Sequence, residues 1–318
     1  MIRSDEVKTL FYRKLKKNFK RVETSRKLVI RYLLAQIVSY FLVLAVICYW
    51  QFLTKINPDI FLAALMISIG LVCGFSVTHK AQKQTYQKNY KRYIVQPIAQ
   101  CIDPNWCYKP FKGIQVKDFK ASKLFPAGFD LYQSDDLISG TIGKTDFQCA
   151  DVHIQKIRNL NGVRSLFQGL FFHADFHKHF RGKIFVSPDF TKGRWGKAGT
   201  FIQKHFVGQG QLVKLENQQF ERLFMVHATN PTEARYVLTP VIMEAMVKLR
   251  QFYDNPIYFA FIGTRLYCAI DFEEALFEPH IFRSAVNYQD VQFMYALLKI
   301  NKIIVEQMQL NTRIWTKA

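Results

Sequence analysis

The sequence predicts an α+β protein, in which an N-terminal two-helix transmembrane hairpin precedes a cytosolic domain with a mainly antiparallel sheet and packed helices. Three observations predict this fold class. Two apolar runs, residues 32–53 and 60–78, are separated by only six residues. Basic residues gather on both sides of this pair of runs. The remaining sequence contains strand pairs and helical segments without a regular βαβ alternation.

The two apolar runs are long enough to cross a membrane. They contain 22 and 19 residues, and neither holds a side chain that is charged at pH 7. At about 1.5 Å per residue, each can cross a hydrocarbon core of about 30 Å as a helix. A core helix of a soluble protein rarely stays apolar on all faces, and a signal peptide has a shorter apolar segment with no second span. We therefore expect membrane insertion.

The charge distribution predicts the topology. Before the first run, 11 basic residues stand against three acidic ones, and further lysines and arginines follow the second run. The positive-inside rule places both flanks in the cytoplasm. We expect a two-span protein of a bacterial inner membrane with both termini cytoplasmic. The formal net charge of +20 also suits polyanions. Membrane-proximal basic residues already explain much of it, so we do not expect nucleic acid as a partner.

The chain is expected to divide into four parts. These are a basic amphipathic leader (1–31), the transmembrane hairpin (32–78, with spans 32–53 and 60–78), a stalk helix with a linker (79–110) and a cytosolic α+β domain (111–318). The leader has apolar residues at helical spacing, so it can lie on an anionic leaflet or stay solvated. In the second span, Gly70 and Gly74 form a small-xxx-small step. We expect it to pack inside the hairpin, with a homodimer seam as the alternative.

The cytosolic part shows alternating strand and helix patterns. Strands are predicted at 137–142, 145–157, 166–175, 183–188, 212–215, 224–228, 256–262 and 265–271. Helices are predicted near 116–124, from residue 231, at 239–252 and at 287–308. Asn230 with Glu233 has the spacing of a capping box, and Pro97 should end or kink the stalk helix. The six cysteines contain no CxxC pair, which indicates free thiols in a reducing compartment.

Several segments carry a resemblance that covers nearly the whole chain. The most specific are LENQQFE from Leu215, EARYVLTP from Glu233 and residues 257–270, together with the two spans. With its LEN-x-x-FE and EARY-x-LTP motifs, the chain resembles a family of uncharacterised bacterial membrane proteins, defined by a domain of unknown function and sometimes labelled "galanin". The resemblance implies a membrane-anchored cytosolic domain without a known activity, and a LemA-like membrane protein as a partner. It also implies that the positions of His173 and His177 are variable.

Two motifs suggest chemistry but lack its context. The segment 140–145 (GTIGKT) has the wrong glycine spacing for a phosphate-binding loop and lies between strands, so we expect a hairpin turn. His173, His177 and His179 are the densest set of candidate metal ligands, with Asp175 among them. Phenylalanines alternate with them and no carboxylate-rich motif accompanies them. Surface or turn histidines are therefore the preferred interpretation, with no metal and no cofactor.

A basic, glycine-rich loop at 192–199 is the candidate binding site. Lys192, Arg194 and Lys197 supply charge, and Trp195 suits the headgroup boundary of a membrane. Anionic lipid headgroups are the candidate ligand, and an ordinary loop with Trp195 packed on the domain is the alternative. The carboxylates Asp135, Asp136, Glu216, Glu221, Glu233, Glu273 and Glu274 are scattered, and Glu273-Glu274 should be solvated.

These observations favour a membrane-anchored binding or scaffold module at the membrane surface. No catalytic residues are predicted, because no nucleophile or metal motif has supporting context. A membrane-associated enzyme that acts on a lipid or anionic substrate is the first alternative, and a secreted bacterial effector inserted in a host membrane is the second. The enzyme question stays open, with the balance against catalysis. The lipid bilayer is the expected partner.

Overall fold

A computed structural model of the 318-residue chain describes residues 4–52, 57–125, 128–158, 162–175, 179–189 and 208–307. The chain forms two compact units. Unit 1 comprises Met1–Cys101 and Glu278–Met294, and unit 2 comprises Ile102–Phe277 and Tyr295–Ala318. The glycine-rich loop at 192–199 and His177 lie outside the described residues.

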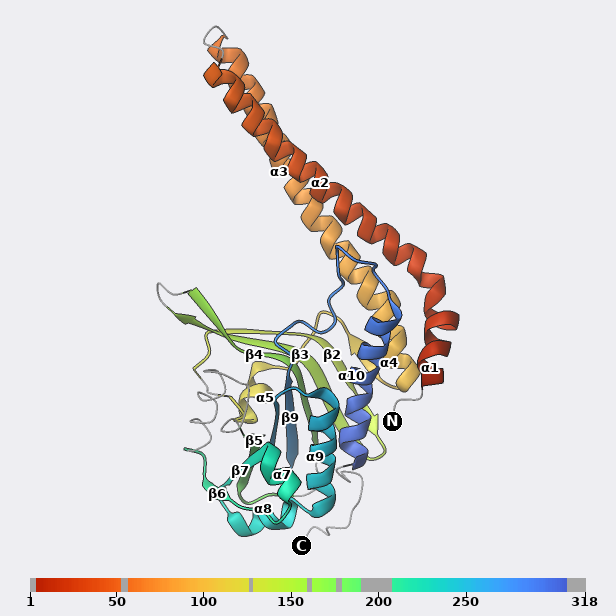
Figure 1. The fold of residues 1–318 in the computed structure, drawn as a ribbon, viewed down its shortest axis with the longest axis vertical. Coiled ribbons are helices and arrows are strands. Elements are labelled where there is room, and N and C mark those ends of the chain that lie inside the picture. Colours follow the sequence, from red (N-terminus) through yellow and green to blue (C-terminus); the bar gives the residue numbers. More distant parts are fainter. Residues whose placement is uncertain are drawn as a thin grey trace. The chain divides into compact units, whose positions relative to one another are not determined.

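Unit 1 is built on two long antiparallel helical segments (Figure 1). The first consists of α1 (Ser4–Thr9), a π-helical turn η1 (Leu10–Leu15) and α2 (Lys16–Phe52). The second consists of α3 (Pro58–Tyr90), a π-helical turn η2 (Lys91–Val95) and α4 (Gln96–Ile102). Asn57 caps α3 by accepting a hydrogen bond from the N–H of Asp59, and Pro58 occupies the first helical position. The leader and the first apolar run share the helix α2.

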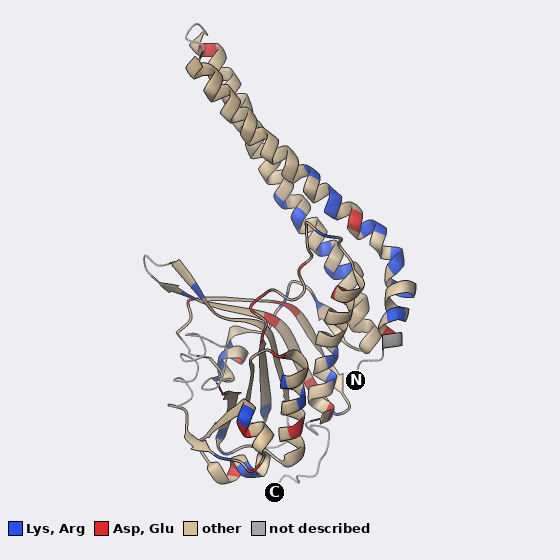
Figure 2. Ribbon diagram, viewed as in Figure 1, with Lys and Arg blue, Asp and Glu red and all other residues tan. Residues whose placement is uncertain are grey.

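The apolar halves of α2 and α3 are exposed. Both helices are long and apolar enough to cross a membrane, and only 6% of the most apolar 18-residue stretch of each is buried. Figure 2 shows that lysine and arginine gather on the halves of these helices farther from the turn. Length and composition alone would also admit a buried core helix or a signal sequence, but a core helix would be mostly buried.

The two glycines of α3 do not pack against α2. Apart from the adjoining backbone of α3 itself, no atom lies within 4 Å of the position that a Cβ would occupy on Gly70 or Gly74. The expectation that this step packs inside the hairpin is therefore wrong. The helices instead meet through residues such as Gln36, whose amide donates to the Ser76 hydroxyl at 3.0 Å.

Pro97 does not end the second helical segment. The carbonyl of Tyr93, four residues before this proline, is also not left unpaired. A proline lacks the N–H that would bond to the carbonyl four residues earlier, which here belongs to Tyr93. The helix passes through the π-helical turn η2 and continues as α4. The Tyr93 carbonyl accepts a hydrogen bond from the Asn18 side chain at 3.1 Å. Because α2 supplies the missing donor, the proline costs the backbone no buried acceptor.

Residues Glu278–Met294, the later stretch of unit 1 in the sequence, are held to the helices by polar contacts. Glu278 accepts from Lys91 at 3.0 Å and from Gln87 at 2.7 Å. The Lys91 side chain is 2% exposed, so its charge needs this partner. The hydroxyl of Tyr86 donates to the His280 carbonyl at 2.7 Å, and burial raises the pKa of this phenol well above its usual value. The segment therefore belongs to the helical unit, although some 180 residues separate it in sequence.

The described residues of unit 2 form a nine-stranded sheet in the order β1-β2-β3-β4-β9-β8-β5-β7-β6, and the strand pairs are all antiparallel. The strands are β1 (Cys107–Lys109), β2 (Leu131–Ile142), β3 (Thr145–Arg158), β4 (Gly162–Asp175), β5 (Lys183–Pro188), β6 (Gln211–Val213), β7 (Phe224–Ala228), β8 (Ile257–Ile262) and β9 (Arg265–Asp271). The helices in the described part of this unit are α5 (Val116–Ala121), α7 (Gln218–Leu223), α8 (Pro231–Val237), α9 (Pro240–Tyr253) and the end of α10 (Tyr288–Gln307). The predicted α+β class is confirmed.

Helices cover both faces of the sheet (Figure 1). On one face, Phe119 of α5 packs against Phe171 of β4, with ring centroids 4.8 Å apart. On the other face, the side chain of Asn301 of α10 lies beside the thiol of Cys149 on β3. Ala150, the next residue of β3, belongs to the core under α5, and successive side chains of a strand point to opposite faces, so Cys149 faces away from α5. We call the first of these the α5 face.

The two predicted hairpins with glycine turns are confirmed. Ile142 pairs with Thr145 and Ile262 with Arg265, and the intervening Gly143 and Gly263 have φ of 63° and 62°. Glycine adopts this left-handed conformation without steric cost. The GTIGKT segment is therefore a hairpin turn.

The role predicted for Glu233 is corrected. Asn230 does cap α8, accepting from the N–H groups of Thr232 and Glu233. The Glu233 carboxylate, however, accepts from the N–H groups of Arg181 at 3.0 Å and Gly182 at 2.7 Å. A Cβ on Gly182 would lie 2.8 Å from this carboxylate, so a larger residue there would displace the carboxylate from its hydrogen-bonded position. Glu233 fastens the chain before β5 to α8.

Candidate functional site

Two cavities in unit 2 lie on either side of the chain that follows β6. We call them the β6 cavities. The larger, of about 460 Å³, is lined by Lys214, Leu215, Glu216, Asn217, Arg235, Leu238, Pro240 and Met243. The smaller, of about 430 Å³, is lined by Asp189, Leu212, Val213, Lys214, Gln218, Glu221, Arg222, Phe224, Met225 and Val226. Both volumes fall within the range of about 300–1,000 Å³ that small-molecule sites occupy.

Hydrogen bonds hold the loop between the two cavities in shape. Asn217 caps α7 by accepting from the N–H of Phe220 at 3.0 Å. Glu221, one turn into α7, reaches back and accepts from the N–H of Leu215 at 3.0 Å. These two bonds close the loop on itself, because each joins it to the first turns of α7. Lys214 precedes the closed loop and lines both cavities.

The opposite wall of the larger cavity is the junction between α8 and α9. Leu238 ends α8, and Thr239 caps α9 by accepting from the N–H of Ile242 at 3.4 Å. The tight junction places Arg235 and Pro240 on the same cavity, which the largely buried side chains of Leu238 and Met243 also line. The two motifs of the sequence resemblance thus meet across this cavity.

The larger cavity combines an apolar lining with exposed cations. Neither Lys214 nor Arg235 forms an ion pair with a carboxylate of the described part of the chain. Glu216 is also exposed at this cavity. The arrangement suits a ligand that has an apolar part and an anionic group, since the apolar lining buries the first and the cations bind the second.

The candidate metal ligands do not form a cluster in the described part of the chain. His173 is buried on β4, so the interpretation of a surface or turn histidine is wrong for this residue. Its ring lies near those of Phe171 and Tyr267, and its Nε2 has no hydrogen-bond partner. Burial, reinforced by the charge of Arg265, lowers the pKa of His173 to about 4. His179 is exposed.

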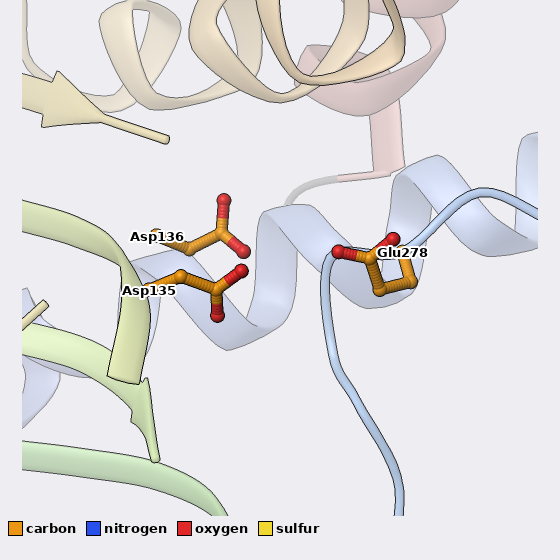
Figure 3. A group of neighbouring side chains, drawn as sticks. All are labelled: Asp135, Asp136 and Glu278. Atoms are coloured by element: carbon orange, nitrogen blue, oxygen red, sulfur yellow. The ribbon is translucent and has the colours of Figure 1, made fainter. Parts of the chain in front are cut away.

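The acidic residues take different places. Glu273 and Glu274 are exposed, as expected of a solvated pair. At an irregularity in β2, Asp136 has a φ of 56° and is buried, and its carboxylate accepts from the Tyr108 hydroxyl. Figure 3 shows the Asp136 carboxylate beside that of Asp135, with oxygens within 4.8 Å; Glu278, also labelled there, belongs to unit 1.

Sequence reasoning did not bring the cavity residues together. Lys214, Arg222 and Arg235 are single basic residues in separate elements, with no spacing that marks a site. The available signals were the capping residues Asn217 and Thr239, which predict helix starts but not that the two helices border one cavity. The motifs of the resemblance contain Arg235 and were the nearest pointer to the site.

Comparisons with known proteins match this chain to a family of unknown function. Residues 165–310, a little less than half of the chain, match a family described as "Protein of unknown function (DUF3137)". This agrees with the resemblance to an uncharacterised family. Curated proteins provide no match to the chain. A solved structure titled "crystal structure of the mycobacterial trehalose monomycolate transport factor A, TtfA" is 9% identical, with a TM-score of 0.34, covering 68% of this chain and 94% of that one. At that score it carries no argument about this chain.

Proposed function

We propose that this chain is a membrane-anchored binding module. In this proposal α2 and α3 cross a bacterial inner membrane, both termini are cytoplasmic, and unit 2 presents the β6 cavities to the cytosol. The ligand is a small molecule or chain segment with an apolar part and an anionic group. Anionic headgroups are a further ligand for the basic loop of Lys192, Arg194, Trp195 and Lys197.

One observation carries the membrane part of the proposal. Large apolar side chains of α2 and α3 point away from the hairpin, with Phe41, Phe52, Met66 and Val77 each at least 64% exposed. Monomeric soluble proteins rarely expose contiguous apolar surface beyond a few hundred Å². In a bilayer the same side chains contact lipid, and the helical backbone satisfies its own hydrogen bonds. The basic residues beyond the apolar halves support the cytoplasmic assignment of both flanks.

Cysteine labelling tests the topology. In a background without the native cysteines, Asn57→Cys and Lys317→Cys variants are treated in whole cells with a membrane-impermeant maleimide. We expect Asn57→Cys to react and Lys317→Cys to react only after the cells are permeabilised. Labelling of Lys317→Cys in intact cells would contradict the topology, and extraction of the protein by carbonate would contradict the membrane spans.

A methyl NMR titration tests the larger β6 cavity. The protein is labelled with ¹³C at its methionine methyl groups, reconstituted in lipid nanodiscs and titrated with decanoate, an anionic amphiphile. The signal of Met243, assigned with Met243→Leu, should shift, and Arg235→Gln should weaken the response at least fivefold. Decyltrimethylammonium should not compete, and Lys248→Gln, which removes an exposed lysine of α9 outside the cavity, should have no effect. An unchanged Met243 signal would refute the cavity assignment.

A further inference from the structure

The chain before α10 forms a loop, residues 278–287, that packs against the helical segments of unit 1. In Figure 1 it is the blue stretch that rises beside α3 and turns back into α10. Glu278 bonds Lys91 at 3.0 Å, and two residues later the His280 carbonyl accepts from the Tyr86 hydroxyl at 2.7 Å. Tyr86 lies nearer than Lys91 to the apolar run of α3. The loop therefore first runs toward the apolar part of the hairpin.

The loop turns back beside α2. The Arg26 guanidinium donates to the Ile281 carbonyl at 2.8 Å, and the Ala285 N–H donates to the Glu23 carboxylate at 3.2 Å. Arg26 lies nearer than Glu23 to the apolar run of α2, so the chain is moving away from that run again when it reaches Ala285. Residues 282–284 are therefore the part of the loop nearest the two apolar runs.

Side chains on both sides hold this turn in place. Glu23 and Arg26 bond each other at 3.0 Å, so a single ion pair on α2 binds the chain before and after the turn. Arg283, within the turn, bonds Asp290 of α10 at 2.9 Å. Asn287 caps α10 by accepting from the N–H of Asp290 at 2.7 Å. The position of the turn is thus fixed by α2 and by the first turn of α10.

Phe282 projects from the held turn. Its side chain is 83% exposed, although Phe277 before it and Ala285 after it are buried. Because hydrogen bonds hold the backbone on each side, a loose chain does not account for this exposure. A single exposed apolar side chain is common on a soluble surface. What distinguishes Phe282 is its level along the hairpin.

The helix rise gives that level. Arg26 lies six residues before Tyr32, where the first apolar run begins, which corresponds to about 9 Å of helix. Tyr86 lies eight residues after Thr78, the last residue of the second run, which corresponds to about 12 Å. A headgroup layer extends about 5–8 Å beyond the hydrocarbon core on each side of a bilayer. The remaining gap of a few Å can be spanned by one extended residue and the ring of Phe282.

Exposed cations occupy the helices between the turn and the apolar runs. Arg31 ends the basic part of α2, and Lys80 and Lys83 follow the second apolar run in α3. All three are exposed. Basic side chains at this level attract anionic lipid headgroups, and an adjacent aromatic side chain can bury its ring at the boundary between headgroups and acyl chains. The charge around the turn thus favours a lipid surface as the contact of Phe282.

We propose that Phe282 enters the cytoplasmic leaflet and contacts lipid below the headgroups, while Arg31, Lys80 and Lys83 bind anionic headgroups around it. This inference rests on the membrane spans of the proposed function. It adds a second contact with the bilayer, made by a segment far from the spans in sequence. Because the 278–287 loop leads directly into α10, this contact holds the start of α10 at the membrane surface.

Photo-crosslinking in a bilayer tests the contact. p-Benzoylphenylalanine replaces Phe282 in the full chain, which is reconstituted in nanodiscs of phosphatidylcholine and phosphatidylglycerol, irradiated and analysed for lipid adducts by mass spectrometry. The same replacement at Phe41, 66% exposed within the first apolar run, is the positive control. Replacement at Tyr12, 60% exposed and about 30 Å of helix before that run, is the negative control. We expect a lipid yield at Phe282 at least tenfold above that at Tyr12.

A pair of variants tests whether the held turn places the ring. Arg26→Met removes the donor to the Ile281 carbonyl and should lower the lipid yield at Phe282 at least threefold. Lys27→Met is the matched control, because it removes one positive charge from the same turn of α2 and leaves the bond to Ile281 in place. It should leave the yield unchanged.

The controls separate failure of this inference from failure of the membrane spans. Lipid adducts at Phe41 with none at Phe282, or adducts of Phe282 with protein only, would overturn the inference and leave the spans standing. Equal lipid yields at Tyr12 and Phe282 would also overturn it, since the loop would then have no preferred contact. A lack of lipid adducts at Phe41 would overturn the spans and this inference together.

Discussion

Two buried titratable groups of unit 2 should give opposite pH dependences of stability. Burial raises the pKa of Asp271 to about 6 from an ordinary value of 3.8. Burial and the charge of Arg265 lower the pKa of His173 to about 4 from 6.5. The folded state thus holds the Asp271 proton more tightly than the unfolded chain, and the His173 proton less tightly. We expect Asp271→Asn and His173→Phe to separate the two effects.

The sign and size follow from linkage between protonation and folding. The contribution of Asp271 is fully present below pH 3.8 and is lost as the pH rises through about 6. The contribution of His173 is fully present above pH 6.5 and is lost as the pH falls toward 4. At 1.36 kcal/mol per pKa unit, each amounts to about 3 kcal/mol. In the wild type the two slopes nearly cancel between pH 4 and 6.

Denaturant unfolding of the full chain in detergent at a series of pH values measures these slopes. Trp106 packs on Phe147 at 5.0 Å between ring centroids, so its fluorescence reports on unit 2 when the other three tryptophans are replaced. Relative to the wild type, Asp271→Asn should gain about 3 kcal/mol of unfolding free energy between pH 4 and 7. An asparagine oxygen can still accept from the Glu273 N–H, which bonds Asp271 at 3.1 Å.

His173→Phe should show the opposite trend, losing about 3 kcal/mol relative to the wild type over the same range. A constant offset between its curve and that of the wild type reports packing of the new ring, whereas the slope reports the lost titration. The double variant should again run parallel to the wild type. Difference curves that are flat for both single variants, or that share one sign, would refute the assigned burial of these groups.

Three further predictions concern single contacts. Glu233→Ala should lower the unfolding free energy by about 2–4 kcal/mol, because two N–H groups lose a charged acceptor, whereas a thermal midpoint within 1 °C of the wild type would contradict this. Asn18→Leu leaves the Tyr93 carbonyl without its donor and should cost about 1–3 kcal/mol in the thermal unfolding of unit 1; no loss would show that water replaces the amide. Gly70→Val should disrupt a homodimer seam without disturbing the hairpin, measured by sedimentation in detergent, and a wild type that sediments as a monomer would exclude the seam.

Local patterns predicted the features that arise from neighbouring residues. The apolar runs, the cap at Asn230 and the turns at Gly143 and Gly263 all depend on a few consecutive residues, and the structure contains each of them. Where a local pattern allowed two partners, the prediction was less reliable. The spacing of Asn230 and Glu233 suits a capping box, yet the Glu233 carboxylate bonds N–H groups some 50 residues earlier in the chain.

The burial of single side chains and the pairing of distant segments could not be predicted from the sequence. His173 looked like a residue of a strand end, but pairing of β4 with β9 places it under α5 beside Tyr267. The Gly70 and Gly74 step is the same in sequence whether it faces α2 or the outside. The side on which the two glycines lie depends on the rotation of α3 about its axis relative to α2. Contacts between side chains of the two helices, such as Gln36 with Ser76, fix this rotation.

The sequence by itself determined the hairpin of apolar helices, the α+β class and the short-range turns, because hydrophobic burial and backbone conformation act over one or two turns of chain. Tertiary structure alone decided that Glu233 bonds Arg181 and Gly182, that Lys214 and Arg235 share a cavity and that residues 278–294 join the helical unit. Each of these contacts closes a loop of some 20 residues or more, and the same local sequence is compatible with many such closures. The packing of the whole chain selects one of them.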